Sequence, residues 1–321
     1  MRAHPNGRRA FLKKMTALGA AGLPLAAVPA RAAKSSYDPA ARFTVKVSEV
    51  PFRRTPAGRE LIARIYQPEG AGPFPVLLDL QGGGWTRKDR LANEPMDRAI
   101  AASGMLVVAV DLRLSGEAPY PASVQDANYG VRWLKWKAAA GWNGDASTLG
   151  VLGSSSGGHI GLLLALRPRD ARYNEIKLAE APTLDATFSY LATRAPVSDP
   201  YARHLIAERL KKEELAKGSR AYFTPWENIH DGNPQEILDR REKVTLPPLL
   251  IMQGGADDHV IPSNQKKFAD AYRAAGGQCQ LEIFEGAEHE WTANPGPNTD
   301  RSYEVVKAFI ARQLNSAQRA A

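Results

Sequence analysis

Cysteine is almost absent from this 321-residue chain. Cys279 is the only one, so no internal disulfide can hold the fold together. No stretch reaches the roughly 18–20 consecutive apolar residues that a membrane-spanning helix needs. No two histidines stand at the spacing of metal ligands, and no GxGxxG motif is present. The sequence therefore predicts neither a metal nor a nucleotide cofactor.

Acidic side chains are missing from residues 1–32, which carry six lysines and arginines. The net charge of +8 would suggest a nucleic-acid partner if it were spread over a folded surface. Without these six charges, however, residues 33–321 carry only +2. We therefore expect no nucleic-acid partner for the folded part of the chain.

The same N-terminal segment has the layout of an export signal. A basic start precedes the weakly apolar run 15–28 and the small-residue site Ala30-Arg31-Ala32. The stretch 7–13 resembles a twin-arginine signal, with glycine where serine or threonine is usual. We expect residues 1–32 to be cleaved as a signal peptide, leaving a periplasmic or secreted domain over 33–321 without a membrane anchor. A retained anchor is the alternative, but the apolar run is too short for it.

Strand and helix patterns alternate along the remaining chain. Residues 43–50 and 60–66 alternate in polarity like half-buried strands, whereas continuous apolar runs suit strands covered on both faces. These runs are residues 75–80, 105–110, 149–152 and 249–252. Amphipathic patterns predict helices at 123–140 and 301–313. The order predicts one α/β domain with a mostly parallel sheet and helices on both faces.

Residues 197–246 interrupt this alternation. They are polar and rich in charge, with a helical pattern at 204–217 and a loop that carries Tyr222, Phe223 and Trp226. Inserted late in a wound α/β domain, the segment predicts a helical cap over the strand ends where ligands bind. A solvated surface excursion fits the same composition equally well.

Residues Gly153-Ser154-Ser155-Ser156-Gly157 form a GxSxG motif after the apolar run 148–152 and before the helical stretch 159–166. A strand that turns sharply into a helix holds the central serine on a strained backbone and exposes its hydroxyl. Ser155 is the serine with glycine at both required offsets, so it is the predicted nucleophile. A plain serine- and glycine-rich loop is the alternative, but such a loop does not require the flanking strand and helix.

A serine hydroxyl needs a base to take its proton and a third group to orient that base. His289 follows the predicted last strand, 280–284, whereas the other histidines lie in the N-terminal segment, the helix of Ser155, the insertion or the acid loop. His289 is therefore the predicted base. Asp257 and Asp258 both follow the run 249–252, and their position alone leaves either as the orienting acid.

A glycine triplet, Gln81-Gly82-Gly83-Gly84-Trp85, follows the predicted strand 76–80. Without side chains, its backbone can approach a substrate closely. We expect the N–H groups of Gly83 and Gly84, together with that of Ser156, to form an oxyanion hole.

Taken together, these motifs resemble the α/β-hydrolase superfamily and, within it, the hormone-sensitive-lipase-like and acetyl-esterase branch. The resemblance spans about residues 43–314 and rests on the glycine loop, on Arg113-Leu114 through Pro119-Tyr120-Pro121 to Asp126-Ala127, and on residues 153–158. It implies the α/β-hydrolase fold and hydrolysis of small carboxylic esters through an acyl-enzyme. The acid loop 254–260 resembles a GxxDDxV pattern whose first aspartate is catalytic, which selects Asp257.

Two departures from the branch concern its loops, because Gln81 replaces the histidine that braces the glycine loop and Leu112 replaces a tyrosine. Glutamine can still donate and accept hydrogen bonds. Trp85 and the aromatic residues of the insertion predict a substrate pocket, although large side chains in such loops often only pack. Two other functions fit parts of the sequence: an exopeptidase or amidase of prolyl-oligopeptidase type, and a non-catalytic binding protein.

Overall fold

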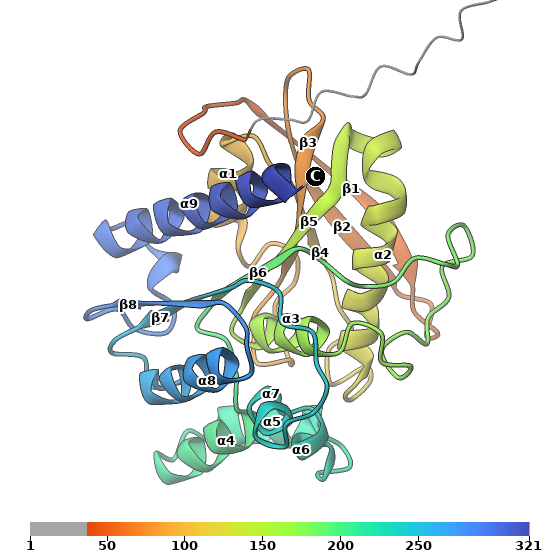
Figure 1. The fold of residues 1–321 in the computed structure, drawn as a ribbon. Helices are drawn as coiled ribbons and strands as arrows, with labels where there is room; N and C mark the ends of the chain where they lie inside the picture. The colour runs from red at the N-terminus through yellow and green to blue at the C-terminus, as the bar shows by residue number, and fades with distance from the viewer. Residues whose placement is uncertain (1–36, 321) are drawn as a thin grey trace, which may run out of the picture. The chain divides into compact units, whose positions relative to one another are not determined.

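The computed structural model describes residues 37–320, so the predicted signal peptide lies outside the described residues. Its centre is an eight-stranded sheet of order β1-β2-β4-β3-β5-β6-β7-β8 (Figure 1). The strands are β1 (Val45–Arg54), β2 (Glu60–Pro68), β3 (Phe74–Leu80), β4 (Leu106–Val110), β5 (Gly144–Ser154), β6 (Tyr190–Arg194), β7 (Leu249–Gly254) and β8 (Cys279–Phe284). β2 pairs antiparallel with both β1 and β4, and β3 to β8 pair in parallel. The predicted fold class is confirmed.

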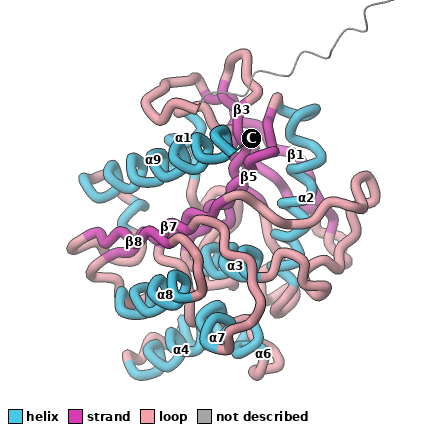
Figure 2. Tube along the Cα trace, viewed as in Figure 1, coloured by secondary structure: helices cyan, strands magenta, loops and turns pink. Residues whose placement is uncertain are grey.

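The helices are α1 (Glu94–Ala102), α2 (Ala122–Trp142), α3 (Ser156–Leu166), α4 (Pro200–Arg209), α5 (Glu213–Tyr222), α6 (Asn228–Asp231), α7 (Pro234–Asp239), α8 (Pro262–Ala274) and α9 (Pro297–Ala320), with a short 3₁₀ turn at Trp291–Ala293. Figure 2 shows α1 and α9 on one face of the sheet and α3 and α8 on the other. Within residues 37–320, no helix combines the length and the apolar character that crossing a membrane demands.

Each central strand supplies side chains to two hydrophobic cores, since successive residues of a strand point to opposite faces. In β4, Leu106, Val108 and Val110 join the core beneath α2, α3 and α8, while Val107 and Ala109 join the core beneath α1 and α9. This explains why the sequence shows continuous apolar runs at these strands and no alternation.

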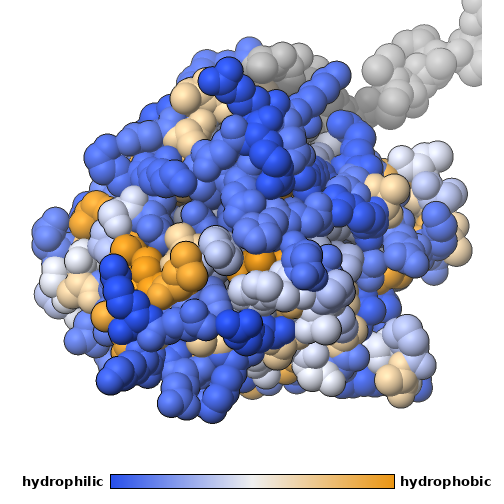
Figure 3. All heavy atoms as spheres, turned by 90° about the horizontal axis from the view of Figure 1, so that it is seen from below, coloured by the Kyte–Doolittle hydropathy of each residue, from blue (hydrophilic) through white to orange (hydrophobic). Residues whose placement is uncertain are grey.

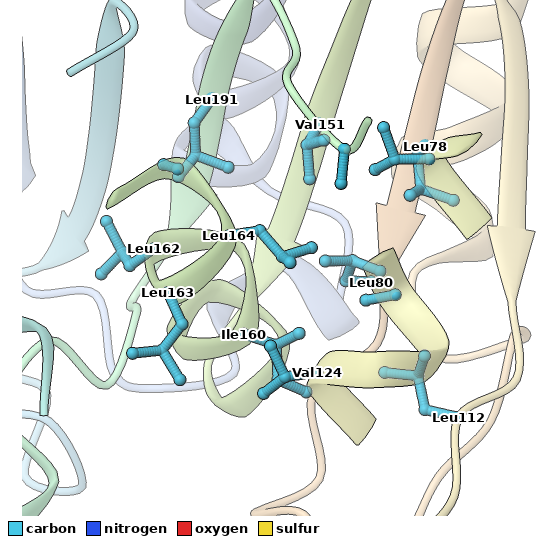
Figure 4. Close-up of a cluster of buried hydrophobic side chains, with 14 of the residues drawn as sticks. Leu78, Leu80, Leu112, Val124, Val151, Ile160, Leu162, Leu163, Leu164 and Leu191 are labelled. Carbon is cyan, nitrogen blue, oxygen red and sulfur yellow. The ribbon is translucent and has the colours of Figure 1, made fainter. Parts of the chain in front are cut away.

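Helix α3 is the apolar centre of the first core. All eleven of its residues are buried. Figure 4 shows Ile160, Leu162, Leu163 and Leu164 facing apolar side chains of neighbouring strands and of α2. A helix that is apolar all round is typical of a fully covered position. This packing fixes the N-terminus of α3, and with it Ser155, against the end of the sheet.

The insertion 197–246 folds into the helices α4 to α7, which lie together at the lower end of Figure 1. Figure 3 views the molecule from this lower side and shows a mostly hydrophilic surface with separate apolar patches. The prediction of one helix over 204–217 is wrong. Lys211 has a φ of 54°, which ends α4 before α5 begins. At the other end, the Asp199 carboxylate accepts the Ala202 N–H at 2.9 Å and starts α4 earlier than expected.

Candidate active site

Ser155 occupies the turn between β5 and α3, with φ 51° and ψ −114°. This is a left-handed φ that a residue other than glycine rarely adopts, and the surrounding close packing maintains it. A Cβ on Gly157 would lie 2.0 Å from the carbonyl oxygen of Leu80, at the end of β3. Glycine is therefore required at this position, because the turn presses directly against the neighbouring strand.

The three side chains predicted for nucleophile, base and acid lie in one hydrogen-bonded chain. The Ser155 Oγ is 3.0 Å from the His289 Nε2, and the His289 Nδ1 is 2.8 Å from the Asp257 Oδ2. All three residues are buried. An Nδ1–H directed to the carboxylate leaves Nε2 free to accept the serine proton, which is the tautomer that a general base needs.

Both oxygens of the Asp257 carboxylate accept hydrogen bonds. Its Oδ1 accepts the N–H groups of His259 and Val260 at 2.9 Å, and its Oδ2 also accepts the Gln253 side chain at 3.0 Å. Burial opposes the charge, but the hydrogen bonds and the nearby His289 outweigh it and place the pKa of Asp257 below its ordinary value. Asp258 instead faces solvent and pairs with Lys212. The structure thus brings Asp257, and not Asp258, to His289.

The glycine loop lies directly against the turn of Ser155. A Cβ on Gly82 would meet the Ser155 Cβ at 3.3 Å, and Gly83 and Gly84 have positive φ values of 106° and 64°. Among residues 37–320, no hydrogen-bond acceptor occupies the N–H of Gly83 or Gly84. Ser156 is the first residue of α3, where backbone N–H groups have no partner within the helix. All three predicted donors are therefore close to Ser155 in the fold and free of helical or loop partners.

Trp85 is placed differently from the prediction of a substrate-binding residue. Its indole stacks on Tyr222 with ring centres 4.8 Å apart, and its Nε1–H donates to His159 Nδ1 at 3.2 Å. The His159 Nε2–H donates in turn to the Gly232 carbonyl at 2.7 Å. Burial lowers the pKa of His159 to about 4, so this imidazole is neutral. Trp85 packs inside the protein because its N–H and ring both find partners there.

This chain of hydrogen bonds joins the glycine loop to α3 and to the insertion. Gln81, at the position where the branch carries a bracing histidine, is buried and its Oε1 has no partner among the described residues. The link from Trp85 through His159 to Gly232 therefore fixes the loop through contacts that Gln81 does not make.

A small cavity opens at Ser155, lined by the three glycines, by His289 and by residues that sequence reasoning missed. Arg194 ends β6, a strand whose five residues gave no clear apolar run. Arg203 of α4 and Leu215 of α5 reach the cavity from the insertion. A polar helix gives no local signal that one of its arginines is buried, so only the tertiary fold could locate Arg203.

Behind the cavity wall lies a pair of buried carboxyl groups. Asn93 donates to both oxygens of Asp79, at 2.9 and 3.1 Å, whereas neither oxygen of Asp97 has a partner among the described residues. Burial raises the pKa of Asp79 to about 7, and burial together with the neighbouring Asp79 raises that of Asp97 well above its ordinary range. The two groups thus disfavour each other's charge.

The cavity contains no set of side chains suited to a metal, because no cluster of three or more His, Cys, Asp or Glu occurs in the described part of the chain.

A family model described as the alpha/beta hydrolase fold matches residues 77–293. The chain belongs to the alpha/beta hydrolase family. Within it, the chain falls in the hormone-sensitive-lipase-like and acetyl-esterase branch that its motifs predicted.

Relatives of known name agree with this family. The esterase LipI of Mycobacterium tuberculosis is 35% identical over 247 residues, which cover 75% of this chain and 73% of LipI. The carboxylesterase NlhH of the same organism is 28% identical over 227 residues, covering 69% of this chain and 68% of NlhH. Among solved structures, the esterase LipW of Mycobacterium marinum aligns with a TM-score of 0.66 at 23% identity, covering 84% of this chain and 82% of LipW. This last likeness shows a shared fold.

Proposed function

We propose that the protein is a serine esterase that hydrolyses small carboxylic esters through an acyl-enzyme. The observation that carries this proposal is the chain from Ser155 through His289 to Asp257 beside unoccupied backbone N–H groups. The names of the relatives support ester hydrolysis over the exopeptidase and binding-protein alternatives. The large extra domain typical of prolyl oligopeptidases also has no counterpart in residues 37–320.

In the first half-reaction, the Ser155 Oγ attacks the ester carbonyl while His289 Nε2 takes its proton. The N–H groups of Gly83, Gly84 and Ser156 stabilise the negative charge that develops on the carbonyl oxygen. As the carbon–oxygen bond of the alcohol breaks, the imidazolium returns the proton to the leaving alcohol. Asp257 keeps the imidazole in the required tautomer and stabilises its positive charge.

In the second half-reaction, a water molecule takes the place of the alcohol. His289 removes one of its protons, the resulting hydroxide adds to the acyl carbon, and the oxyanion again lies against the same N–H groups. The bond from the acyl carbon to Ser155 then breaks, and His289 returns the proton to the serine oxygen. The products are a carboxylic acid and the regenerated enzyme.

The insertion 197–246 acts as a cap in this proposal, because Arg203 and Leu215 form part of the wall of the cavity at Ser155. We also propose that the protein is exported to the periplasm or secreted, on the evidence of the basic and apolar segments of residues 1–32. Cell fractionation followed by mass spectrometry of the N-terminus checks both export and cleavage after Ala32.

The proposed roles are tested with a short-chain nitrophenyl ester and a fluorophosphonate label. Ser155→Ala should abolish labelling and lower kcat by about 10³-fold or more. Asp257→Asn should lower kcat by roughly 10³- to 10⁴-fold because the amide does not hold the required tautomer. Asp258→Asn is the matched control and should stay within about threefold. Labelling that persists in Ser155→Ala, or equal losses in the two aspartate variants, would overturn the assignment.

A further inference from the structure

The cavity at Ser155 is lined by an excess of positive charge. Its wall contains Arg87, Lys88, Arg194 and Arg203 but only one acidic residue, Glu290. Glu290 pairs with Lys88 at 2.7 Å and its charge also acts on Arg194, so no acidic residue of the wall pairs with Arg203. A concave site lined by one sign of charge attracts ligands of the opposite sign.

Arg203 is the most unusual of these cations. The residue is only 4% exposed, and its guanidinium forms no ion pair with a carboxylate of the described residues, although the charge of Asp257 acts on it from a longer distance. One of its five N–H groups donates to the Ser219 Oγ at a long 3.3 Å, and the buried Nε has no partner. The Cζ lies 5.4 Å from the centre of the Trp85 ring, but that contact satisfies no N–H group. Burial lowers the pKa of Arg203 to about 10, so the group is protonated at neutral pH.

Other arginines with little exposed surface have stronger partners. The part-buried Arg53 and Arg113 both bind Asp126, although the Nε of Arg53 also has no partner among the described residues. Arg132 lacks a carboxylate but donates to the Asn128 side chain at 2.8 Å and to the Ile176 carbonyl at 2.7 Å. An arginine held out of water normally needs such partners, because an unpaired buried charge strongly destabilises the fold. Arg203 has no such partner within the described part of the protein, and it lines the cavity that contains Ser155.

Arg194 adds a second charge to the same wall. It is 7% exposed and uses Nη1 to donate to the His289 carbonyl at 2.9 Å, which ties it to the histidine loop. Its guanidinium lies 5.5 Å from the Trp291 ring centre and forms no ion pair with a described carboxylate. Arg194 is thus a positioning residue for His289 that also raises the positive potential of the cavity.

We propose that the ester substrate carries a carboxylate group and that Arg203 binds it during catalysis. This inference rests on the proposed esterase function and names its substrate class. A carboxylate presents two oxygens to the planar fork of a guanidinium and would satisfy the N–H groups that the protein leaves free. Because Arg203 and Ser155 line one cavity, the carboxylate lies close to the scissile ester within a small molecule.

The site leaves room only for a small substrate. The cavity at Ser155 has a volume of about 30 Å³, so an ester bound there must extend into neighbouring space. An adjoining cavity of about 210 Å³ shares Lys88, Asn93, Arg194 and Glu290 with it. The larger cavity along residues 286–299 contains none of Ser155, Asp257 and His289 and is therefore not the site of this chemistry.

The test compares charged esters with matched neutral ones. Monoethyl succinate against diethyl succinate places the charge on the acyl side, and 4-acetoxybenzoate against methyl 4-acetoxybenzoate places it on the alcohol side. We expect kcat/KM to favour the charged member by tenfold or more in at least one pair. A preference for the neutral member in both pairs would overturn the inference while leaving the esterase intact.

Variants of Arg203 identify the residue responsible. Arg203→Gln should reduce the charged-to-neutral ratio of kcat/KM by tenfold or more, and Arg203→Lys should retain part of it. Arg209→Gln, on the exposed side of the same helix, is the control and should leave both rates unchanged. Equal losses on charged and neutral esters in Arg203→Gln, with a lowered melting temperature, would show that Arg203 only packs against Trp85.

A binding measurement separates this inference from the proposed function. Calorimetry with succinate and 4-hydroxybenzoate on the Ser155→Ala variant needs no turnover. We expect saturable binding of at least one anion that weakens tenfold or more when Arg203→Gln is added. If neither the charged nor the neutral esters are hydrolysed but this binding is found, the esterase proposal fails and the anion site stands. If no binding is found, the anion site fails.

Discussion

Replacing Asp97 by asparagine should make the protein more stable at alkaline pH. Asp97 has no hydrogen-bond partner among the described residues and neighbours Asp79, whose pKa is raised to about 7 by burial. Since one pKa unit corresponds to about 1.4 kcal/mol, a rise from 3.8 to about 7 costs the folded state on the order of 4 kcal/mol once the proton is lost. Burial also raises the pKa of Asp97 well above 3.8, so each pH unit over which Asp97 keeps its proton in the folded state costs about 1.4 kcal/mol, and an asparagine, which has no proton to lose, removes this cost.

The sign of the pH dependence follows from the raised pKa values. Between about pH 4 and pH 7 the folded protein holds a proton that the unfolded chain has already released. The contribution of this pair to the free energy of unfolding is therefore greatest below pH 4, falls through this window and is lowest above it. The gain in Asp97→Asn should therefore be larger at pH 8 than at pH 5 and nearly absent below pH 4.

Urea unfolding at pH 5 and pH 8 measures this difference directly. Wild type, Asp97→Asn and Asp300→Asn should be compared, because Asp300 is exposed and reports the effect of removing an ordinary carboxylate. The reasoning is refuted if Asp97→Asn loses stability equally at both pH values, because a charge-independent packing role for Asp97 would then dominate.

Three further predictions follow from packing. Gly157→Ala should yield unfolded protein or lower kcat by more than about 100-fold, because the new Cβ would lie 2.0 Å from the Leu80 carbonyl oxygen. Gly116→Ala is the control, since its Cβ would meet no atom within 4 Å, and its kcat should be unchanged. His159→Leu should lower the free energy of unfolding in denaturant by about 1–3 kcal/mol and should lower kcat, because it leaves the Trp85 N–H and the Gly232 carbonyl unpaired. An unchanged kcat would show that this link does not position the glycine loop. Leu164→Ala should lower the free energy of unfolding by about 2–5 kcal/mol, because the side chain is fully buried. A loss no larger than that of Leu205→Ala, at an exposed leucine, would contradict the packing described for α3.

The sequence was sufficient for the type of sheet and for most of its strands. Strand runs such as 75–80 and 105–110 are continuous and apolar because the strands are covered on both faces, so their pattern is strong. The five-residue strand β6 was missed because Thr193 and Arg194 end it and leave only a very short apolar core. The break at Lys211 was missed because the surrounding leucine, lysine and glutamate residues all favour a helix.

The residues of the candidate site also divide into those that a local sequence pattern identifies and those that only the folded structure distinguishes. Ser155 and His289 could be chosen because each follows a strand at a position with a local signature, but Asp257 and Asp258 are adjacent and chemically identical. Their difference arises from the turn itself, in which the N–H groups of His259 and Val260 turn one carboxylate inward. Trp85 was predicted from its position beside the glycines, and its inward packing depends on Tyr222 and His159, which lie far away in the chain.

His159 bonds both the glycine loop, through Trp85, and the insertion, through Gly232, so a movement of one affects the other. A movement that lifts residues 228–233 away from the sheet would break the bond to Gly232 and release the ring that holds the Trp85 indole. The glycine loop, which we propose to bind the oxyanion, would then lose this anchor. The position of the glycine loop therefore depends on residues 228–233 remaining packed against His159.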